Sequence, residues 1–240
     1  MFVADKLVYL QLPKAASTFI TSVLSKNMDG QRIGHHTTLD SRPDGSIIIS
    51  SIRNPWDWYV SLWAFGCSGH GGVWKKLNRR NERRPDLWRE CYSDANDPNK
   101  FRRWLQAFMN PSKSDQWKFY PQIPMRGVAG IYTYRLLKMT SLTDHWAEQS
   151  TQLRSPADIE RHFETASVVD RFVRCESLRT DLEAIIEDAG LPPLVFPADK
   201  RNASEHAAPN YYYDEESIEL IRSRDPLIVE TFGYAGPSVD

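Results

Sequence analysis

Apolar and polar positions in the first part of the chain alternate between strand-like runs and helix-like stretches. Residues 6–12 (KLVYLQL) form an apolar run rich in strand formers, and Pro13 ends it. Residues 17–28 then carry apolar side chains three and four positions apart, which is the spacing of one helix face. The pattern predicts a strand, a tight loop and a helix in succession.

A second unit of the same kind follows. Residues 46–52 (SIIISSI) predict a buried strand. Asn54 and Pro55 predict the start of a helix that runs to about Phe65, because Asn is a favourable N-cap and Pro suits the first helical position.

The second half of the chain returns to this alternation. Residues 167–174 predict a strand, and residues 178–189 predict a helix closed by Gly190. Two shorter helices are expected to start at Asp214 and at Asp225. Alternating strands and helices favour an α/β fold, with a mostly parallel sheet flanked by helices on both faces.

Residues 66–120 show a different pattern. They contain a glycine-rich sequence (GCSGHGG), a basic run and scattered tryptophans, and residues 101–108 keep helical spacing. At 240 residues the chain is long enough for one sizeable α/β domain. We expect a single domain over residues 1–240, with residues 66–120 as a helical and loop insertion.

Charge and composition narrow the classes of function. Thirty basic and thirty-one acidic residues give a net charge of -1, which leaves no overall field to attract nucleic acid or an anionic membrane. The three cysteines form no CxxC pair and suit a reducing compartment, and no apolar run is long enough to span a membrane. We expect a soluble, cytoplasmic chain. No metal is expected, because Cys67 and His70 lack two further ligands.

The loop before the first helix is the first candidate for chemistry. The N–H groups and the dipole at a helix start favour an anion, and Lys14, Ser17 and Thr18 add donors there. The chain contains no GxxxxGK[ST] pattern, so this is not a Walker A loop. The alternative is an ordinary helix cap beside a solvated lysine.

A second anion site is indicated where the next strand ends. Arg53 stands immediately before the capped helix, and Ser61 follows on that helix. The alternative is that Arg53 pairs with Asp57 and that Ser61 is an ordinary surface residue.

Together the two segments resemble the sulfotransferases that use 3′-phosphoadenosine 5′-phosphosulfate (PAPS), and in particular the carbohydrate-type enzymes. The matching sequences are Pro-Lys-x-x-Ser-Thr (13–18), Arg-Asn-Pro (53–55) followed by Ser61, DRFVRCESLRTD (170–181) and the ending from residue 200 onward. Residues 66–120 lie outside the match, and the family usually has a glycine where Ala16 stands.

The resemblance implies a P-loop-kinase-like core and a set of donor-binding residues. It assigns the 5′-phosphosulfate to the loop residues Lys14, Ala15, Ala16, Ser17 and Thr18. It assigns the 3′-phosphate to Arg53 and Ser61, and it adds Arg201, Asn202 and Ser204 to the cofactor-binding residues.

Two adjacent histidines are candidates for a general base. Transfer of a sulfuryl group to an alcohol requires removal of the hydroxyl proton, and neutral histidine suits that step near pH 7. Neighbouring strand residues point to opposite faces, so at most one of His35 and His36 is expected to face the cleft. Residues 34–39 resemble the histidine segment of uronyl 2-O-sulfotransferases, which implies that His35 is the base. The alternative is a glutamate elsewhere, such as Glu176.

We therefore expect a PAPS-dependent sulfotransferase that releases PAP and sulfates a hydroxyl of a small molecule or glycan, with a carbohydrate or glycolipid favoured. Lys14 and the helix start would stabilise charge on the departing phosphate without a metal. Residues 66–120 are expected to form one wall of the acceptor site, with a basic mouth made by Lys75, Lys76, Arg79 and Arg80. The alternatives are a nucleoside or sugar kinase on a related P-loop fold and a non-catalytic PAP-binding module.

Overall fold

The computed structural model describes residues 1–78, 85–109, 124–197 and 206–239. The chain divides into two compact units. The first comprises Met1–Arg53, Tyr134–Thr151 and Ala157–Ala203, and the second comprises Asn54–Thr133, Gln152–Pro156 and Ser204–Asp240. All strands of the described residues belong to the first unit, and the second unit is helical.

The first unit is built on a mixed sheet with the strand order β3-β1-β2-β4-β5 in the described residues. Its strands are β1 (Phe2–Ala4), β2 (Leu7–Leu10), β3 (Gly30–Arg32), β4 (Ile47–Ile52) and β5 (Arg171–Arg174). β2, β4 and β5 run parallel, whereas β1 is antiparallel to β2 and to β3. The prediction of a mostly parallel sheet is wrong on the β1 side. There a short turn joins β1 to β2, and so short a connection permits only antiparallel pairing.

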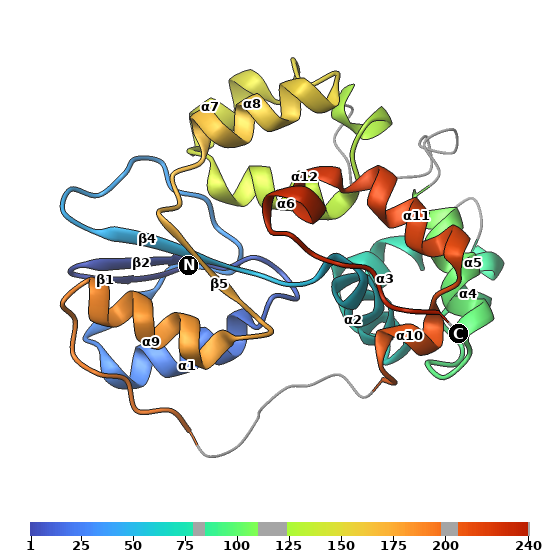
Figure 1. Cartoon of the computed structure of the whole chain (residues 1–240), viewed down its shortest axis with the longest axis horizontal. Coiled ribbons are helices and arrows are strands. Elements are labelled where there is room, and N and C mark those ends of the chain that lie inside the picture. Colours follow the sequence, from blue (N-terminus) through green and yellow to red (C-terminus); the bar gives the residue numbers. More distant parts are fainter. Residues whose placement is uncertain (79–84, 110–123, 198–205, 240) are drawn as a thin grey trace. The chain divides into compact units, whose positions relative to one another are not determined.

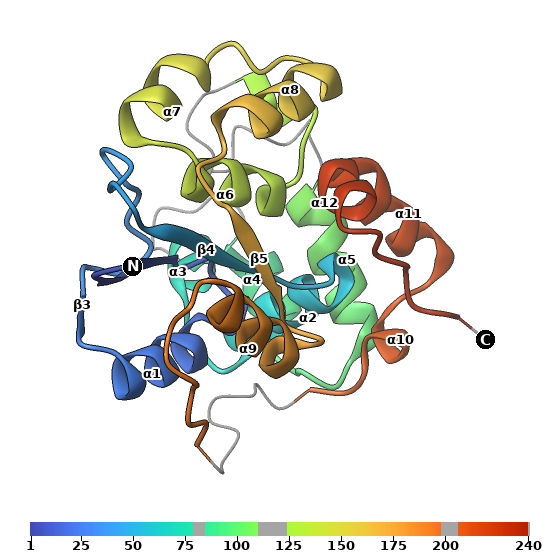
Figure 2. The same ribbon diagram turned by 60° about the vertical axis from the view of Figure 1, so that its left-hand side comes forward.

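Side chains alternate between the two faces of this sheet. Leu7 and Tyr9 pack with α1 and α9 on one face, whereas Val8 and Leu10 belong to a second apolar cluster on the other. The helices that contribute to this unit are α1 (Ser17–Asn27), α6 (Ile131–Thr140), α7 (Thr143–Gln149), α8 (Pro156–Ala166) and α9 (Leu178–Asp188). Figures 1 and 2 show α1 and α9 on one side of the sheet and α7 and α8 on the other.

Local sequence signals predicted several of these elements correctly. The predicted helix over 17–28 is α1, and the predicted strand over 46–52 is β4. The helix predicted over 178–189 is α9, and Gly190 after it has the left-handed φ of 63° that a helix end favours. β5 is shorter than the strand predicted over 167–174. Before it begins, the Asp170 carboxylate accepts the N–H of Ile48 at 2.8 Å.

The second unit packs helices around an aromatic core. Its helices in the described residues are α2 (Pro55–Cys67), α3 (Gly72–Leu77), α4 (Pro85–Cys91), α5 (Pro98–Met109), the 3-10 helix η2 (Pro124–Gly127), α10 (Pro209–Tyr212), α11 (Glu215–Arg224) and α12 (Pro226–Thr231). The described part of residues 66–120 forms α3, α4 and α5. Trp88 and Trp104 in this part are fully buried, so they serve the core of the unit.

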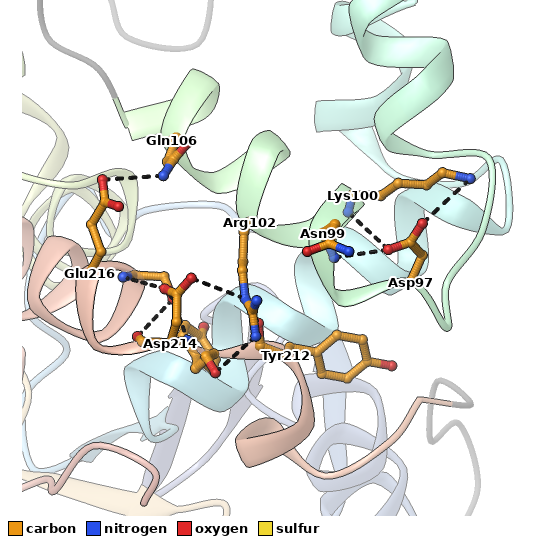
Figure 3. A network of polar contacts seen from close by, with 10 residues as sticks. Asp97, Asn99, Lys100, Arg102, Gln106, Tyr212, Asp214 and Glu216 are labelled. Carbon is orange, nitrogen blue, oxygen red and sulfur yellow. Dashed lines mark hydrogen bonds and ion pairs between the residues drawn. The ribbon is translucent and has the colours of Figure 1, made fainter. Parts of the chain in front are cut away.

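A polar network ties α5 to the segment between α10 and α11 (Figure 3). Arg102 Nε donates to the Tyr212 carbonyl at 2.9 Å and forms an ion pair with Asp214 at 3.3 Å. Asp214 caps α11 through a capping box with Ser217, which confirms the predicted helix start. A few residues along α5, Gln106 donates to Glu216 at 3.3 Å. The network therefore fixes where α11 begins.

A buried carboxylate stabilises the second unit at the start of α6. Asp225 accepts from the Tyr59 hydroxyl at 2.6 Å, from the Thr133 N–H at 2.9 Å and from the Thr133 hydroxyl at 2.7 Å. Gly130 passes so close that a Cβ there would meet the carboxylate oxygens.

Asp225→Asn should lower the free energy of unfolding by about 2 kcal/mol, because an amide replaces one acceptor oxygen with a donor and leaves a buried group unpaired. Urea unfolding would measure the loss. Asp188→Asn, on an exposed residue at the end of α9, is the control with the same change of charge and should have little effect. Equal stability of Asp225→Asn and wild type would contradict the structural role of this carboxylate.

Candidate functional site

The loop between β2 and α1 has the backbone of an anion-binding nest. Lys14 and Ala16 both adopt left-handed conformations, with φ of 62° and 54°, and Ala15 stands between them. Successive residues of alternating hand direct their N–H groups into one concavity. Ala16 is also the N-cap residue of α1 and has no side chain that could cap the helix, so the N–H groups of its first turn face the same loop.

The sequence resemblance implies a glycine at the position of Ala16, and the backbone of Ala16 is left-handed. For an alanine this conformation costs about 1–2 kcal/mol, and the surrounding contacts must hold it. Ala16 is therefore held in a backbone conformation that glycine favours.

Side chains of β4 and of the residue after it contact both β2 and this loop. Ser50 Oγ donates to the Leu10 carbonyl at 2.9 Å, and Ser51 Oγ donates to the Ala15 carbonyl at 2.5 Å. At the end of the strand, Arg53 Nη1 donates to the Lys14 carbonyl at 3.3 Å. The predicted pair of basic residues thus lies together in the first unit, with Arg53 beside the loop that carries Lys14.

The electrostatics of this pair favour an anion. Burial, together with the nearby Arg53 guanidinium, lowers the pKa of Lys14 to about 8. Two cations held close together in a partly buried place repel each other, and an anion between them would relieve that repulsion. The loop can therefore hold a phosphate or sulfate group.

The two histidines lie in a loop, and the assumption that they belong to a strand is wrong. β3 ends at Arg32, and the left-handed residues Gly34 and His36 turn the chain. His35 is exposed. His36 Nδ1 lies 2.8 Å from the carbonyl oxygen of Gln11, the residue that follows β2.

The contact with Gln11 determines which nitrogen of His36 carries a proton. A carbonyl oxygen only accepts, so Nδ1 is the protonated nitrogen, and the neutral ring has an unprotonated Nε2. Burial lowers the pKa of His36, although the Gln11 contact opposes this. The ring is thus neutral near pH 7 and can accept a proton at Nε2.

Sequence analysis did not identify three residues of this site. Gln11, Tyr9 and Ser51 are buried, and each looked like part of a strand. Gln11 Nε2 donates to Thr21 Oγ1 at 2.7 Å, and this hydroxyl donates to the Ser17 carbonyl at the start of α1 at 2.7 Å. The signal that could have found them is a polar residue inside an apolar run beside the loop.

The other predicted donor residues lie in the second unit or outside the described residues. Ser61 is buried in α2 and belongs to the second unit. Arg201, Asn202 and Ser204 lie outside the described residues, as do Arg79 and Arg80. Asn54 caps α2 as predicted, because its side-chain oxygen accepts the Trp56 N–H at 3.0 Å.

The described residues contain neither a membrane-spanning helix nor a cluster of metal ligands. None of their helices is both long and apolar enough to cross a membrane. Nor, among the same residues, does any group of three or more histidine, cysteine, aspartate or glutamate side chains come together as metal ligands.

The comparisons with known proteins give the class of this chain. Residues 1–219 match the model of the Sulfotransferase family, a region that contains the nest, Arg53 and both histidines. The chain belongs to this family. It is a PAPS-dependent sulfotransferase. No match was found among curated proteins or among solved structures.

The residues present fit this donor. PAPS is an anion that carries a phosphosulfate on the 5′ oxygen of its ribose and a phosphate on the 3′ oxygen. The nest, Lys14 and the start of α1 offer N–H donors and positive charge to such groups, and Arg53 adds a planar set of donors beside them.

Proposed function

We propose that the protein transfers the sulfuryl group of PAPS to a hydroxyl of a carbohydrate or glycolipid, with a histidine as general base, on a P-loop-kinase-like core. The observation that carries the proposal is the grouping of the nest, Lys14, Arg53 and an oriented imidazole around the end of β2. Each of these has a separate task in sulfuryl transfer.

The loop would hold the 5′-phosphosulfate. The N–H groups of residues 16–18 and the Lys14 ammonium would donate to its oxygens, and the same donors would stabilise charge that builds up on the phosphate during transfer. Ser17 and Thr18 add hydroxyls at the start of α1. Arg53 would bind the 3′-phosphate, and Ser61, Arg201, Asn202 and Ser204 are assigned to the nucleotide by resemblance alone.

His36 would remove the acceptor proton. Its Nδ1–H is held by the Gln11 carbonyl, so Nε2 accepts the hydroxyl proton as the oxygen attacks. His35 is the residue that the resemblance favours, and variants of the two histidines distinguish them. The carbohydrate or glycolipid class of the acceptor rests on the resemblance to carbohydrate-type enzymes.

The alternatives make different predictions. A kinase would require Mg²⁺ and a nucleoside triphosphate, and membership in the sulfotransferase family counts against it. A non-catalytic PAP-binding module would bind PAP and show no turnover with any acceptor. Release of PAP from PAPS in the presence of a glycan panel separates these cases.

PAP should raise the melting temperature more than AMP, which lacks the 3′-phosphate. A ligand that binds only the folded state at a hundred times its Kd adds about 2.7 kcal/mol of stability, or roughly 5–10 °C at this chain length. Arg53→Ala should remove most of the difference between PAP and AMP. The scan is run with and without Mg²⁺ and includes ATP and ADP. Equal shifts with PAP and AMP in the wild-type protein would contradict the 3′-phosphate assignment.

A further inference from the structure

A chain of three buried groups links the centre of the sheet to the donor loop. The Tyr9 hydroxyl lies 2.8 Å from Ser51 Oγ, and Ser51 Oγ lies 2.5 Å from the Ala15 carbonyl oxygen. All three residues are completely buried. None of them can exchange these partners for water.

The direction of the two hydrogen bonds follows from the chemistry of the groups. The Ala15 carbonyl can only accept, so the single proton of the Ser51 hydroxyl is donated there. Tyr9 must then donate its own proton to Ser51 Oγ. Burial raises the pKa of Tyr9, so that this proton stays in place. Hydrogen bonds in such a series polarise one another.

The bond to Ala15 also fixes the orientation of the next N–H. A peptide group is planar and trans, so its N–H and C=O point in opposite directions. With the Ala15 carbonyl held toward Ser51 inside the sheet, the N–H of Ala16 points to the outer side of the loop. The same contact opposes a change of hand at Ala16, whose left-handed backbone is strained for an alanine.

We propose that Tyr9 and Ser51 are positioning residues for the sulfate donor: their hydrogen bonds hold and polarise the Ala15–Ala16 peptide so that its N–H binds the 5′-phosphate. The inference rests on the proposed function, in which this loop holds the phosphosulfate. It adds two residues that would touch neither donor nor acceptor.

Ser51→Ala should weaken PAP binding about tenfold, measured by isothermal titration calorimetry. AMP should lose affinity by the same factor, because both ligands carry the 5′-phosphate that this loop would bind. Tyr9→Phe keeps the ring and removes only the outer bond, so it should weaken both ligands about threefold. Ser51→Thr retains the hydroxyl and should restore most of the affinity.

Ser50→Ala is the matched control. Ser50 is the preceding residue of β4, is equally buried, and donates to the Leu10 carbonyl inside the sheet instead of to the loop. Ser51→Ala removes two buried hydrogen bonds and Ser50→Ala removes one, so Ser51→Ala should lower the melting temperature more. Ser50→Ala should nevertheless leave PAP affinity unchanged. Tyr9→Phe serves as the test if Ser51→Ala does not fold.

The outcomes separate the inference from the proposed function. Wild-type affinity for PAP in both Ser51→Ala and Tyr9→Phe, or an equal loss in Ser50→Ala, would overturn the positioning role. If Lys14→Ala no longer binds PAP under the same conditions, the proposed donor site is supported even though the positioning role is not. If the wild-type protein binds neither PAP nor AMP, the donor site and the positioning role both fail.

Discussion

Lys14→Met should weaken PAP binding about 10- to 100-fold while it raises the stability of the unliganded protein. The first effect is the loss of a charge-assisted hydrogen bond to phosphate, which is worth about 1.5–3 kcal/mol. The second follows from the lowered pKa of Lys14, because the folded protein disfavours the charged ammonium. Calorimetry with PAP and a thermal melt without ligand measure the two effects.

The stability effect depends on pH in a defined direction. The pKa of Lys14 is about 8 in the folded protein and 10.5 as the ordinary value, so between these limits the unfolded chain binds more protons. The contribution of Lys14 to the free energy of unfolding of the wild-type protein therefore rises as pH increases from about 8 to 10.5. The advantage of Lys14→Met should be largest below pH 8 and should disappear as pH approaches 10.5.

PAP affinity should show the opposite trend. Wild-type Lys14 loses its charge above pH 8, so PAP binding should weaken there, and Lys14→Met should lack this part of the dependence. Lys26→Met is the control, because Lys26 is exposed in the last turn of α1, the helix that follows the Lys14 loop. A Lys14→Met protein that binds PAP like the wild type would remove Lys14 from the donor site.

His36→Ala should lower kcat by about a hundredfold or more, which is the usual contribution of a general base. PAP affinity should stay unchanged, because the base acts on the acceptor. The pKa of His36 is lowered by burial, so wild-type kcat should hold its plateau to a pH below 6.5 and then fall as the imidazole gains a proton. Steady-state rates from pH 5 to 8 with a saturating acceptor measure this.

His35→Ala is the matched control, since His35 lies next to His36 in the chain and both side chains are exposed. We expect its kcat to remain within about threefold of the wild-type value, below the usual contribution of a base. A large loss in His35→Ala and a small one in His36→Ala would support the assignment from resemblance, and the contact with Gln11 would then be structural. If neither variant loses activity, Glu176 is the next residue to replace.

Sequence analysis predicted the elements whose ends are marked by a few neighbouring residues of the chain. Pro13 marks the end of β2, and the Asn54-Pro55 pair marks the end of β4 and the start of α2. β1 and β3 were missed because each has only three residues, and all of β3 is exposed and polar or glycine. Their antiparallel pairing depends on contacts between strands, and a local sequence pattern does not predict such contacts.

The candidate site divides in the same way. Lys14 and Arg53 could be predicted because helix starts and strand ends are visible in the sequence, and they do lie together. The positions of the two histidine side chains could not be predicted, because they depend on the left-handed turn at Gly34 and His36. Ser51 was hidden because a serine in a buried strand acquires a role only through the residue opposite it, here Ala15.

The pairing of β4 with β5 has a consequence for how the chain folds. Ile49 is paired with Arg171, about 120 residues further on, and contacts so distant in sequence form slowly because a long loop must close first. β1, β2 and β3 pair within the first 32 residues and need no such closure. During synthesis the β1 side of the sheet can assemble early, whereas the edge of β4 stays unpaired until β5 has been made. Ser50 and Ser51 interrupt the apolar sequence of β4. Polar residues of this kind reduce aggregation of a strand edge that is exposed before its partner strand has been made.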